Sequence, residues 1–174
     1  LGYSILRIDS TMERNESGHA TSRKIGSRSM GWLLLFSVET AALEAIIQDR
    51  ALQRMRVGAM TGIAARHMAR PNSRTVGIFG SGAQAGPQIE ALAAVMKLDT
   101  IKVYSPTRGN REAFARRMDE TLDCRVVPVD GPRDAIAGAD IVVVATNSNE
   151  PVFDGRWLEP GTFVSSIVNS DKVL

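Results

Sequence analysis

A short glycine-containing loop lies between an apolar run and a helical pattern in "TVGIFGSGAQAGPQIEALA", residues 75–93. Gly80, Gly82 and Ala85 have the spacing G-x-G-x-x-[GA]. In such a loop the first glycine permits a tight turn, the second lets the backbone approach a pyrophosphate, and the small third residue lets helix and strand pack closely. The helix N-terminus adds unpaired N–H groups and a positive dipole end. In the alternative interpretation the glycines serve turn geometry alone. We predict a dinucleotide site formed by Gly80, Ser81, Gly82, Ala83, Gln84 and Ala85.

The end of the next predicted strand, "VYSPTRGN" at 103–110, bears on which dinucleotide is bound. NAD-binding proteins usually carry Asp or Glu there, about 20 residues after the loop, for the ribose hydroxyls. This chain has Ser105, Thr107 and Arg108 instead, and its first acid is Glu112. A carboxylate would repel a 2′-phosphate, whereas two hydroxyls and a guanidinium can bind one. NADP(H) is therefore favoured and NAD(H) is possible. The alternative is a solvated turn in which Arg108 faces water.

Strands and helices alternate from about residue 73, which would bring both features to one edge of a sheet. The pattern predicts a Rossmann-type, doubly wound α/β fold with a parallel sheet and right-handed crossovers. Ligands of such folds bind at the carboxyl ends of the strands. The apolar runs predict strands over 75–79, 100–104, 125–129, 140–145 and 161–168.

Single residues indicate how these elements begin, end and pair. Pro128 cannot donate to a ladder, so its strand is expected near an edge of the sheet. Asp130 is a candidate N-cap for a short helix that Gly138 would stop. Glu112 precedes Arg116 by four residues, which is the spacing of a helical ion pair.

The first seventy residues follow another pattern. They begin with a strand-like piece and continue as a long polar stretch. The apolar runs at 31–36 and 42–47 suit a hairpin, although the second run could equally be helical. Apolar residues near helical spacing predict a helix over 49–69, which Pro71 ends.

The composition is that of an ordinary globular protein, with 44% hydrophobic residues, 23% charged residues and a net charge of +2. Basic residues are dispersed, so we expect no nucleic-acid partner. The longest apolar runs fall far short of the roughly 18 residues that a membrane helix requires, so we expect no membrane span. With one cysteine, Cys124, and two histidines, His19 and His67, we expect no internal disulfide, no metal site and a cytoplasmic setting.

Three segments together resemble the ornithine cyclodeaminase/mu-crystallin family: "RMRVGAMTGIAARHMARP", "VGIFGSGAQA" and "ADIVVVATNSNEPVFDGRWLEPGTFVSSI". The resemblance implies an enzyme that moves a hydride between a nicotinamide and the Cα of an amino acid or cyclic imino acid, as a cyclodeaminase (a lyase), a ketimine reductase or an amino-acid dehydrogenase. Family members are usually nearly twice as long and form homodimers. The resemblance therefore divides the chain into 1–70, part of a substrate and dimerisation domain with a connecting helix, and 71–174, a C-terminally incomplete Rossmann domain.

The resemblance also implies roles for individual residues. Arg56 matches an arginine that grips the substrate carboxylate, although Val57 stands where many members have Thr; the alternative is an ordinary exposed arginine. Arg7 falls near a family lysine that contacts substrate, or else is a surface residue at a strand end. The nicotinamide ribose would be bordered by Ala145, Thr146 and Asn147.

The chain departs from the cyclodeaminase pattern near its end. Cyclodeaminases carry an Asp there for the substrate amine and water, and the matching position is Ser170, with Asp171 one residue later. A carboxylate can act as a base, whereas a lone hydroxyl cannot do so near neutral pH. Either Asp171 does this work, or the protein is an imine reductase or amino-acid dehydrogenase. A further alternative is a crystallin-like protein that binds NADP(H) without catalysis.

Overall fold

The computed structural model of the chain describes residues 2–9 and 31–167. It divides into two compact units, Leu1–Arg54 and Met55–Leu174. The boundary falls inside the helix α1 (Arg50–Met68), which is the helix predicted before Pro71. The assignment of residues 1–70 to a substrate and dimerisation domain stays a prediction.

The first unit contains a three-stranded antiparallel sheet in the order β1-β2-β3. The strands are β1 (Tyr3–Asp9), β2 (Gly31–Ser37) and β3 (Leu43–Gln48). β2 and β3 pair as a hairpin with an irregularity between Leu35 and Phe36. The predicted hairpin is therefore confirmed, and its second run is a strand.

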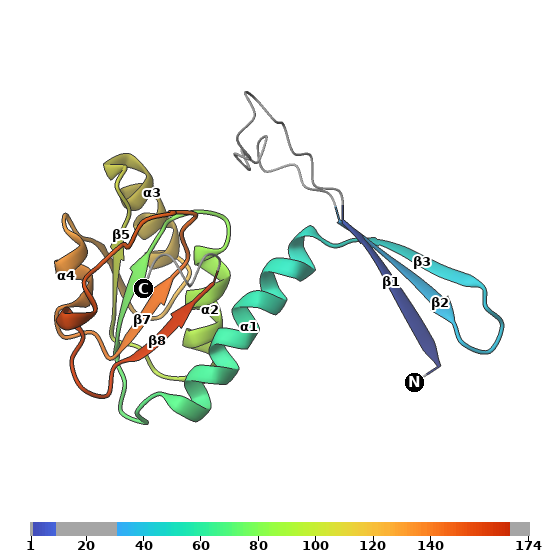
Figure 1. The fold of residues 1–174 in the computed structure, drawn as a ribbon, viewed down its shortest axis with the longest axis horizontal. Helices are drawn as coiled ribbons and strands as arrows, with labels where there is room; N and C mark the ends of the chain where they lie inside the picture. The colour runs from blue at the N-terminus through green and yellow to red at the C-terminus, as the bar shows by residue number, and fades with distance from the viewer. Residues whose placement is uncertain (1, 10–30, 168–174) are drawn as a thin grey trace. The chain divides into compact units, whose positions relative to one another are not determined.

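The second unit contains a five-stranded parallel sheet in the order β6-β5-β4-β7-β8, which confirms the predicted Rossmann-type fold (Figure 1). The strand order reverses between β4 and β7, so a crevice is expected at the carboxyl ends of these two strands. Besides α1, the elements are β4 (Thr75–Phe79), α2 (Ala85–Val95), β5 (Thr100–Tyr104), α3 (Arg108–Asp119), β6 (Arg125–Pro128), α4 (Pro132–Ile136), β7 (Ile141–Val144), the 3-10 turn η1 (Gly155–Trp157) and β8 (Phe163–Ser166).

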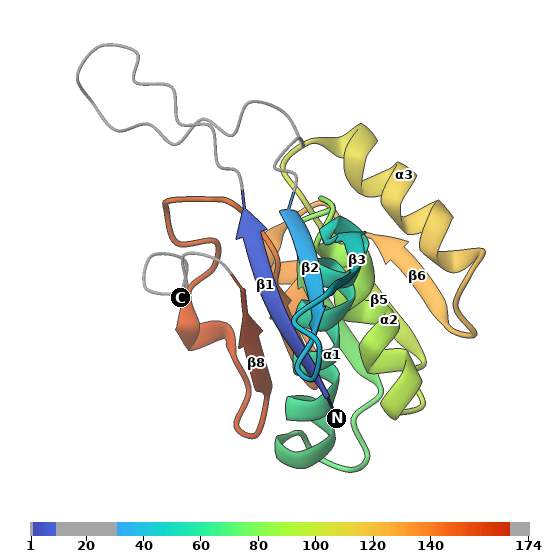
Figure 2. The same cartoon turned by 90° about the vertical axis from the view of Figure 1, so that its right-hand side faces the viewer.

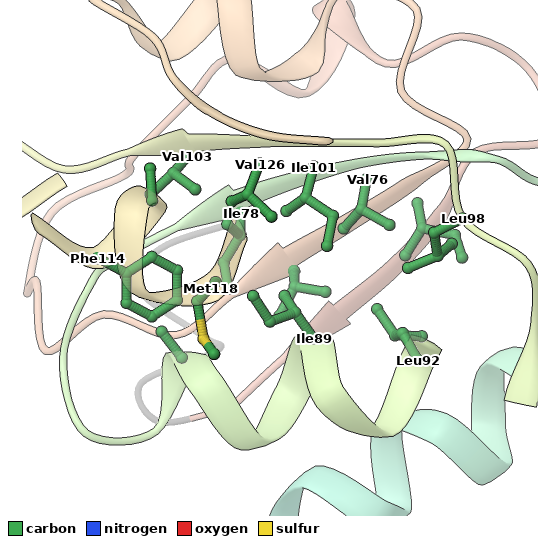
Figure 3. Packing of buried hydrophobic residues seen from close by; sticks show 14 of the residues in the cluster. Val76, Ile78, Ile89, Leu92, Leu98, Ile101, Val103, Phe114, Met118 and Val126 are labelled. Carbon is green, nitrogen blue, oxygen red and sulfur yellow. The ribbon is translucent and has the colours of Figure 1, made fainter. Parts of the chain in front are cut away.

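Helices cover both faces of this sheet, with α4 on one side and α2 on the other in Figure 1. The larger hydrophobic cluster lies between the sheet and α2 and α3, where Val76 and Ile78 of β4 meet Ile89 and Leu92 of α2 (Figure 3). A smaller cluster on the opposite face joins α4 to β4 and β7. All four residues of β7 are buried, as the continuous apolar run predicted.

Pro128 ends β6, which is an edge strand as predicted, and α3 lies beside it (Figure 2). The short helix α4 is followed by Gly138 with φ of 64°, a left-handed conformation that suits a helix stop. The prediction that Asp130 caps α4 is wrong. Gly131 is the N-cap, and its N–H donates to Asp134 Oδ2 at 3.1 Å. Asp130 instead forms an ion pair with Arg111 of α3, a charged partner that outcompetes the capping role.

The helix α1 packs closely on α2 because its glycines face that helix. A Cβ at Gly58 would lie 2.2 Å from the carbonyl oxygen of Pro87, and one at Gly62 would lie 2.8 Å from a carbonyl one turn further along α2. Thr61 Oγ1 also forms a hydrogen bond of 2.9 Å with Ser165 Oγ of β8. The second half of α1 is therefore fixed directly to the Rossmann sheet and its first helix.

One carboxylate joins the beginnings of two strands. Asp140, which precedes β7, accepts hydrogen bonds from the backbone N–H groups of Arg74 (2.8 Å) and Thr75 (3.0 Å) and from Arg70 Nη2 (2.7 Å). Burial raises the pKa of Asp140, but these donors together outweigh it and hold that pKa below its ordinary value. Arg70 Nη1 also donates to the Pro160 carbonyl at 3.2 Å, which extends the connection towards β8.

Candidate functional site

The glycine loop occupies the point where the strand order reverses. Gly80 follows β4 with φ of 111°, and a Cβ there would lie 2.3 Å from the carbonyl oxygen of Ala145, just after β7. The Gly80 N–H donates to the Tyr104 carbonyl at the end of β5 (2.8 Å). The Ala145 N–H donates to the Phe79 carbonyl (2.8 Å). Only glycine satisfies these constraints, so the loop is held against the ends of three neighbouring strands.

Gly82 has the opposite surroundings. A Cβ there would have no atom within 4 Å, and the residue is exposed, so its backbone is open to an incoming group. Gln84 is the N-cap of α2 and makes no side-chain capping hydrogen bond. Its Oε1 is buried and has no hydrogen-bond partner in the described part of the chain. The next residue, Ala85, is fully buried in the core, as a small residue at the helix–strand contact should be.

These features fit the phosphates of a dinucleotide. The first N–H groups of α2 receive no side-chain cap, the backbone at Gly82 is accessible, and a helix of this length contributes a positive end to the site. Ser81 is partly buried and Ala83 is exposed, so both loop residues stay next to solvent. The predicted loop residues therefore lie together at the carboxyl edge of the sheet.

The residues that follow β7 lie at the same edge. Ala145 contacts Gly80, as described above, and is followed by the partly buried Thr146 and the exposed Asn147. The Ser148 N–H donates to Thr146 Oγ1 at 3.2 Å, which gives this segment a local turn. The structure thus brings Ala145, Thr146 and Asn147 to the crevice in which a ligand of this fold is expected.

The residues that follow β5 have different surroundings. Ser105 is buried, with 7% of its surface exposed, and Thr107 is the N-cap of α3 without a side-chain capping bond. Arg108 is the first residue of α3, and 79% of its side chain is exposed. Its Nε donates to Glu112 Oε1 at 2.7 Å. Glu112 therefore pairs with the arginine one turn before it, and not with Arg116, which stands four residues after it.

These contacts shift the pKa of both partners. The hydrogen bond from Arg108 lowers the pKa of Glu112, and nearby Arg116 and Arg111 act in the same direction while burial opposes it. The hydrogen bond to Glu112 raises the pKa of Arg108, with a further contribution from the charge of Asp130. Arg108 thus faces water at the predicted ribose end, and its guanidinium is already paired with the Glu112 carboxylate.

Sequence reasoning missed Arg111. This arginine is buried, and its Nη1 donates to the Ser105 carbonyl at 3.1 Å while its Nη2 donates to Asp130 Oδ1 at 2.5 Å. It therefore joins the turn after β5 to the turn after β6. Arg111 stands three residues before the inward-facing Phe114, a spacing that places both on one face of α3 and could have indicated burial.

The predicted substrate residues lie in different units. Arg56 is exposed on α1, and two residues of helix separate it by ~200° from Gly58, so it faces away from α2. Arg7 lies on β1 in the first unit, where its Nε donates to Asp49 Oδ2. Ser170 and Asp171 lie outside the described residues. The roles of all four stay predictions.

No helix among residues 2–9 and 31–167 is long and apolar enough to cross a membrane. In the same ranges, no group of three or more His, Cys, Asp or Glu side chains could hold a metal ion.

A model of the ornithine cyclodeaminase/mu-crystallin family matches residues 14–172. The chain belongs to this family. A putative dehydrogenase of Rhizobium meliloti is 36% identical over 152 residues, which cover 86% of this chain and 46% of that protein. A similar solved structure is that of Thermococcus litoralis Δ1-pyrroline-2-carboxylate reductase in complex with NADH and L-proline. Its TM-score is 0.77 and its sequence identity 33%, and the match covers 80% of this chain and 43% of the reductase chain. An archaeal alanine dehydrogenase dimer with bound NAD has a TM-score of 0.77 and 30% identity, and the match covers 94% of this chain and 48% of the dehydrogenase chain.

The family resemblance predicted from three sequence segments is thereby confirmed. The chain spans about half the length of the curated relatives it matches. Its described residues include the predicted dinucleotide loop and the ends of the strands around it. The activity of the whole protein, its substrate and its assembly are therefore matters for proposal.

Proposed function

We propose that this member of the ornithine cyclodeaminase/mu-crystallin family is the dinucleotide-binding part of an NAD(P)(H)-dependent enzyme that moves a hydride at the Cα of an amino acid or cyclic imino acid. The observation that carries the proposal is the loop after β4, which has an open backbone at Gly82 and stands at the reversal of strand order. Two similar structures are, by name, a reductase of a cyclic imino acid and a dehydrogenase of an amino acid, and each holds NADH or NAD.

In this proposal the two halves of the dinucleotide lie on either side of the loop. The loop backbone and the N-terminus of α2 bind the pyrophosphate. The adenosine ribose lies at the end of β5, next to Ser105, Thr107 and Arg108. Ala145 and the two residues after it border the nicotinamide end, because β7 lies across β4 from β5. When bound, the dinucleotide donates or accepts the hydride.

The substrate is a small amino acid or cyclic imine with a carboxylate. Arg56 binds that carboxylate, because a planar guanidinium offers two parallel hydrogen bonds. Arg7 is a second candidate residue for contact with the substrate. Asp171, or Ser170 in its place, handles the substrate amine and water. A lone hydroxyl is a poor base near neutral pH, so the pair at 170–171 decides between a cyclodeaminase and a reductase or dehydrogenase. The complete protein acts as a homodimer in the cytoplasm.

NADP(H) is the favoured dinucleotide. The support is the exposed guanidinium of Arg108 at the end of β5, together with the lack of a carboxylate at positions 104–107. We expect Arg108→Ala to weaken NADPH binding by at least tenfold, or about 1.4 kcal/mol, and NADH binding by less than twofold. Nicotinamide fluorescence titration measures both. Equal weakening of the two would refute a phosphate role for Arg108.

The proposal is tested with the protein expressed from its complete reading frame. It is incubated with NADPH and pyrroline-2-carboxylate, a cyclic ketimine, and loss of nicotinamide absorbance is followed. Ammonia release from ornithine with NAD⁺ tests the cyclodeaminase reaction in parallel. Oxidation of NADPH without ammonia release from ornithine supports a reductase, and ammonia release supports a cyclodeaminase.

One observation favours a second candidate, a crystallin-like protein that binds NADP(H) without catalysis. All residues of the dinucleotide loop lie in one unit, whereas Arg7 lies in the other unit and is paired with Asp49. Dinucleotide binding therefore needs less of the protein than catalysis does. Tight NADPH binding with no oxidation of NADPH by cyclic ketimines or 2-oxo acids with ammonia would favour this candidate.

A further inference from the structure

We infer that Glu112 is a specificity residue of the dinucleotide site: its carboxylate opposes a 2′-phosphate at Arg108 and so limits the preference for NADP(H) over NAD(H). The inference rests on the proposed function and adds to it a residue outside the turn after β5. Glu112 lies one helical turn into α3, where the sequence pattern gave it no role in binding.

The geometry of Arg108 allows a phosphate on only part of its guanidinium. The Nε atom is already bound to Glu112 Oε1 at 2.7 Å. Within the described part of the chain, its two terminal nitrogens make no hydrogen bond. A 2′-phosphate at the ribose end would therefore bind these terminal nitrogens, on the opposite side of the guanidinium from Glu112.

The negative charge of Glu112 should weaken the binding of a 2′-phosphate at Arg108. The phosphate would lie roughly 7 Å from the Glu112 carboxylate, a distance built from one guanidinium width and two hydrogen bonds. At this separation a unit negative charge repels a phosphate of nearly two negative charges, and low salt screens the repulsion only partly. The Glu112 carboxylate also cancels the formal charge of Arg108. The phosphate consequently meets a neutral pair instead of a free cation.

The neighbouring arginine does not take over this role. Both terminal nitrogens of Arg111 donate within the protein, one to the Ser105 carbonyl and one to Asp130. Arg111 is also buried, with only 8% of its side chain exposed. Its contacts fix the turn that carries Ser105, so it supports the ribose end from a buried position, away from a phosphate in solvent.

The test compares Glu112→Gln with Glu120→Gln in the protein from the complete reading frame. Glu120 is exposed at the C-terminal end of the same helix, eight residues and ~12 Å further along its axis. The control therefore removes the same charge from the same helix at a distance from the ribose end. Both exchanges affect solvent-accessible groups, so neither should unfold the protein. The dissociation constants of NADPH and NADH are measured by nicotinamide fluorescence at 20 mM and 500 mM salt.

We expect Glu112→Gln to tighten NADPH binding about three- to tenfold at 20 mM salt, to change NADH binding less than twofold, and to lose most of its effect at 500 mM salt. Glu120→Gln should change neither. An unchanged NADPH to NADH ratio in Glu112→Gln, with both dinucleotides bound, overturns the inference alone. Weaker NADPH binding also overturns it, because Glu112 would then hold Arg108 in position for the phosphate. Failure of the unchanged protein to bind either dinucleotide overturns the proposed function and this inference with it.

Discussion

Alanine at the two glycines of the dinucleotide loop should separate folding from binding. In Gly82→Ala the new methyl group meets no atom within 4 Å, and the φ of Gly82 lies outside the left-handed region. The free energy of unfolding should therefore change by less than about 1 kcal/mol. The methyl group would, however, occupy the space through which the backbone approaches the pyrophosphate. We expect a loss of affinity of at least tenfold, about 1.4 kcal/mol, for NADPH and NADH alike.

Gly80→Ala is the contrasting variant. Its methyl group would lie 2.3 Å from the Ala145 carbonyl oxygen, and its φ of 111° is one that L-residues rarely adopt. The backbone strain costs roughly 1–3 kcal/mol, and displacing the end of β7 adds a similar amount. The total, roughly 2–6 kcal/mol, is a large part of the stability of a typical domain. We expect Gly80→Ala to lose both stability and dinucleotide binding.

Both variants are measured by urea unfolding, followed through tryptophan fluorescence, and by nicotinamide fluorescence titration at a temperature where each is folded. The refuting result is specific. If Gly82→Ala binds NADPH and NADH with unchanged affinity, the pyrophosphate does not lie on this loop. If Gly82→Ala is destabilised as much as Gly80→Ala, the conclusion that a methyl group at Gly82 meets no neighbouring atom is refuted instead. Gly109, which also has open surroundings but lies in α3, provides a control for the effect of adding a methyl group.

Two further predictions concern the packing and hydrogen bonds that stabilise the Rossmann unit. Gly58→Ala should destabilise the protein by roughly 2–4 kcal/mol, because its methyl group would lie 2.2 Å from the Pro87 carbonyl oxygen and force α1 away from α2. The control is Gly109→Ala, whose methyl group has no such neighbour. In urea unfolding this control should be neutral or stabilising. Asp140→Asn should cost roughly 1–3 kcal/mol near pH 7, because the ionised acceptor of the Arg74 and Thr75 N–H groups is lost. The folded-state pKa of Asp140 is lowered, so its contribution is present above the ordinary carboxyl range near pH 4 and is lost as pH falls through the folded pKa. Urea unfolding at pH 7 and pH 3 should therefore show a smaller difference between Asp140→Asn and the unchanged protein at the lower pH, and an equal difference at both values would contradict the assignment.

The parallel sheet could be predicted from the sequence because its signals are local. Four consecutive apolar residues in β7 indicate a strand buried on both faces, and Pro128 indicates an edge. The glycine at position 80 is similarly informative, since a tight turn after a strand leaves few other residues possible. These features depend on neighbours within a few residues of the chain, which is the range that a sequence pattern describes.

Long-range side-chain pairs could not be predicted in the same way. Arg111 binds Asp130, nineteen residues later, and nothing in the sequence of α3 indicates the distance to the turn after β6. Glu112 had two possible partners at helical spacing, Arg108 before it and Arg116 after it, and spacing alone does not choose between them. The packing of Gly58 against α2 depends on how two helices cross, which is also absent from a local pattern.

On the inference drawn above, we expect the choice between the two dinucleotides to depend on a charge cluster and not on one residue type at a strand end. Two arginines, Arg108 and Arg111, stand beside two carboxylates, Glu112 and Asp130, and their formal charges cancel. A sequence rule that reads only the turn after β5 finds Arg108 and predicts a positive site for a 2′-phosphate. The structure adds the two carboxylates, one a helical turn away and the other on the next strand connection. We therefore expect the preference for NADP(H) to depend on whether Arg108 can exchange an internal carboxylate for a phosphate, which is the exchange that Glu112→Gln changes directly.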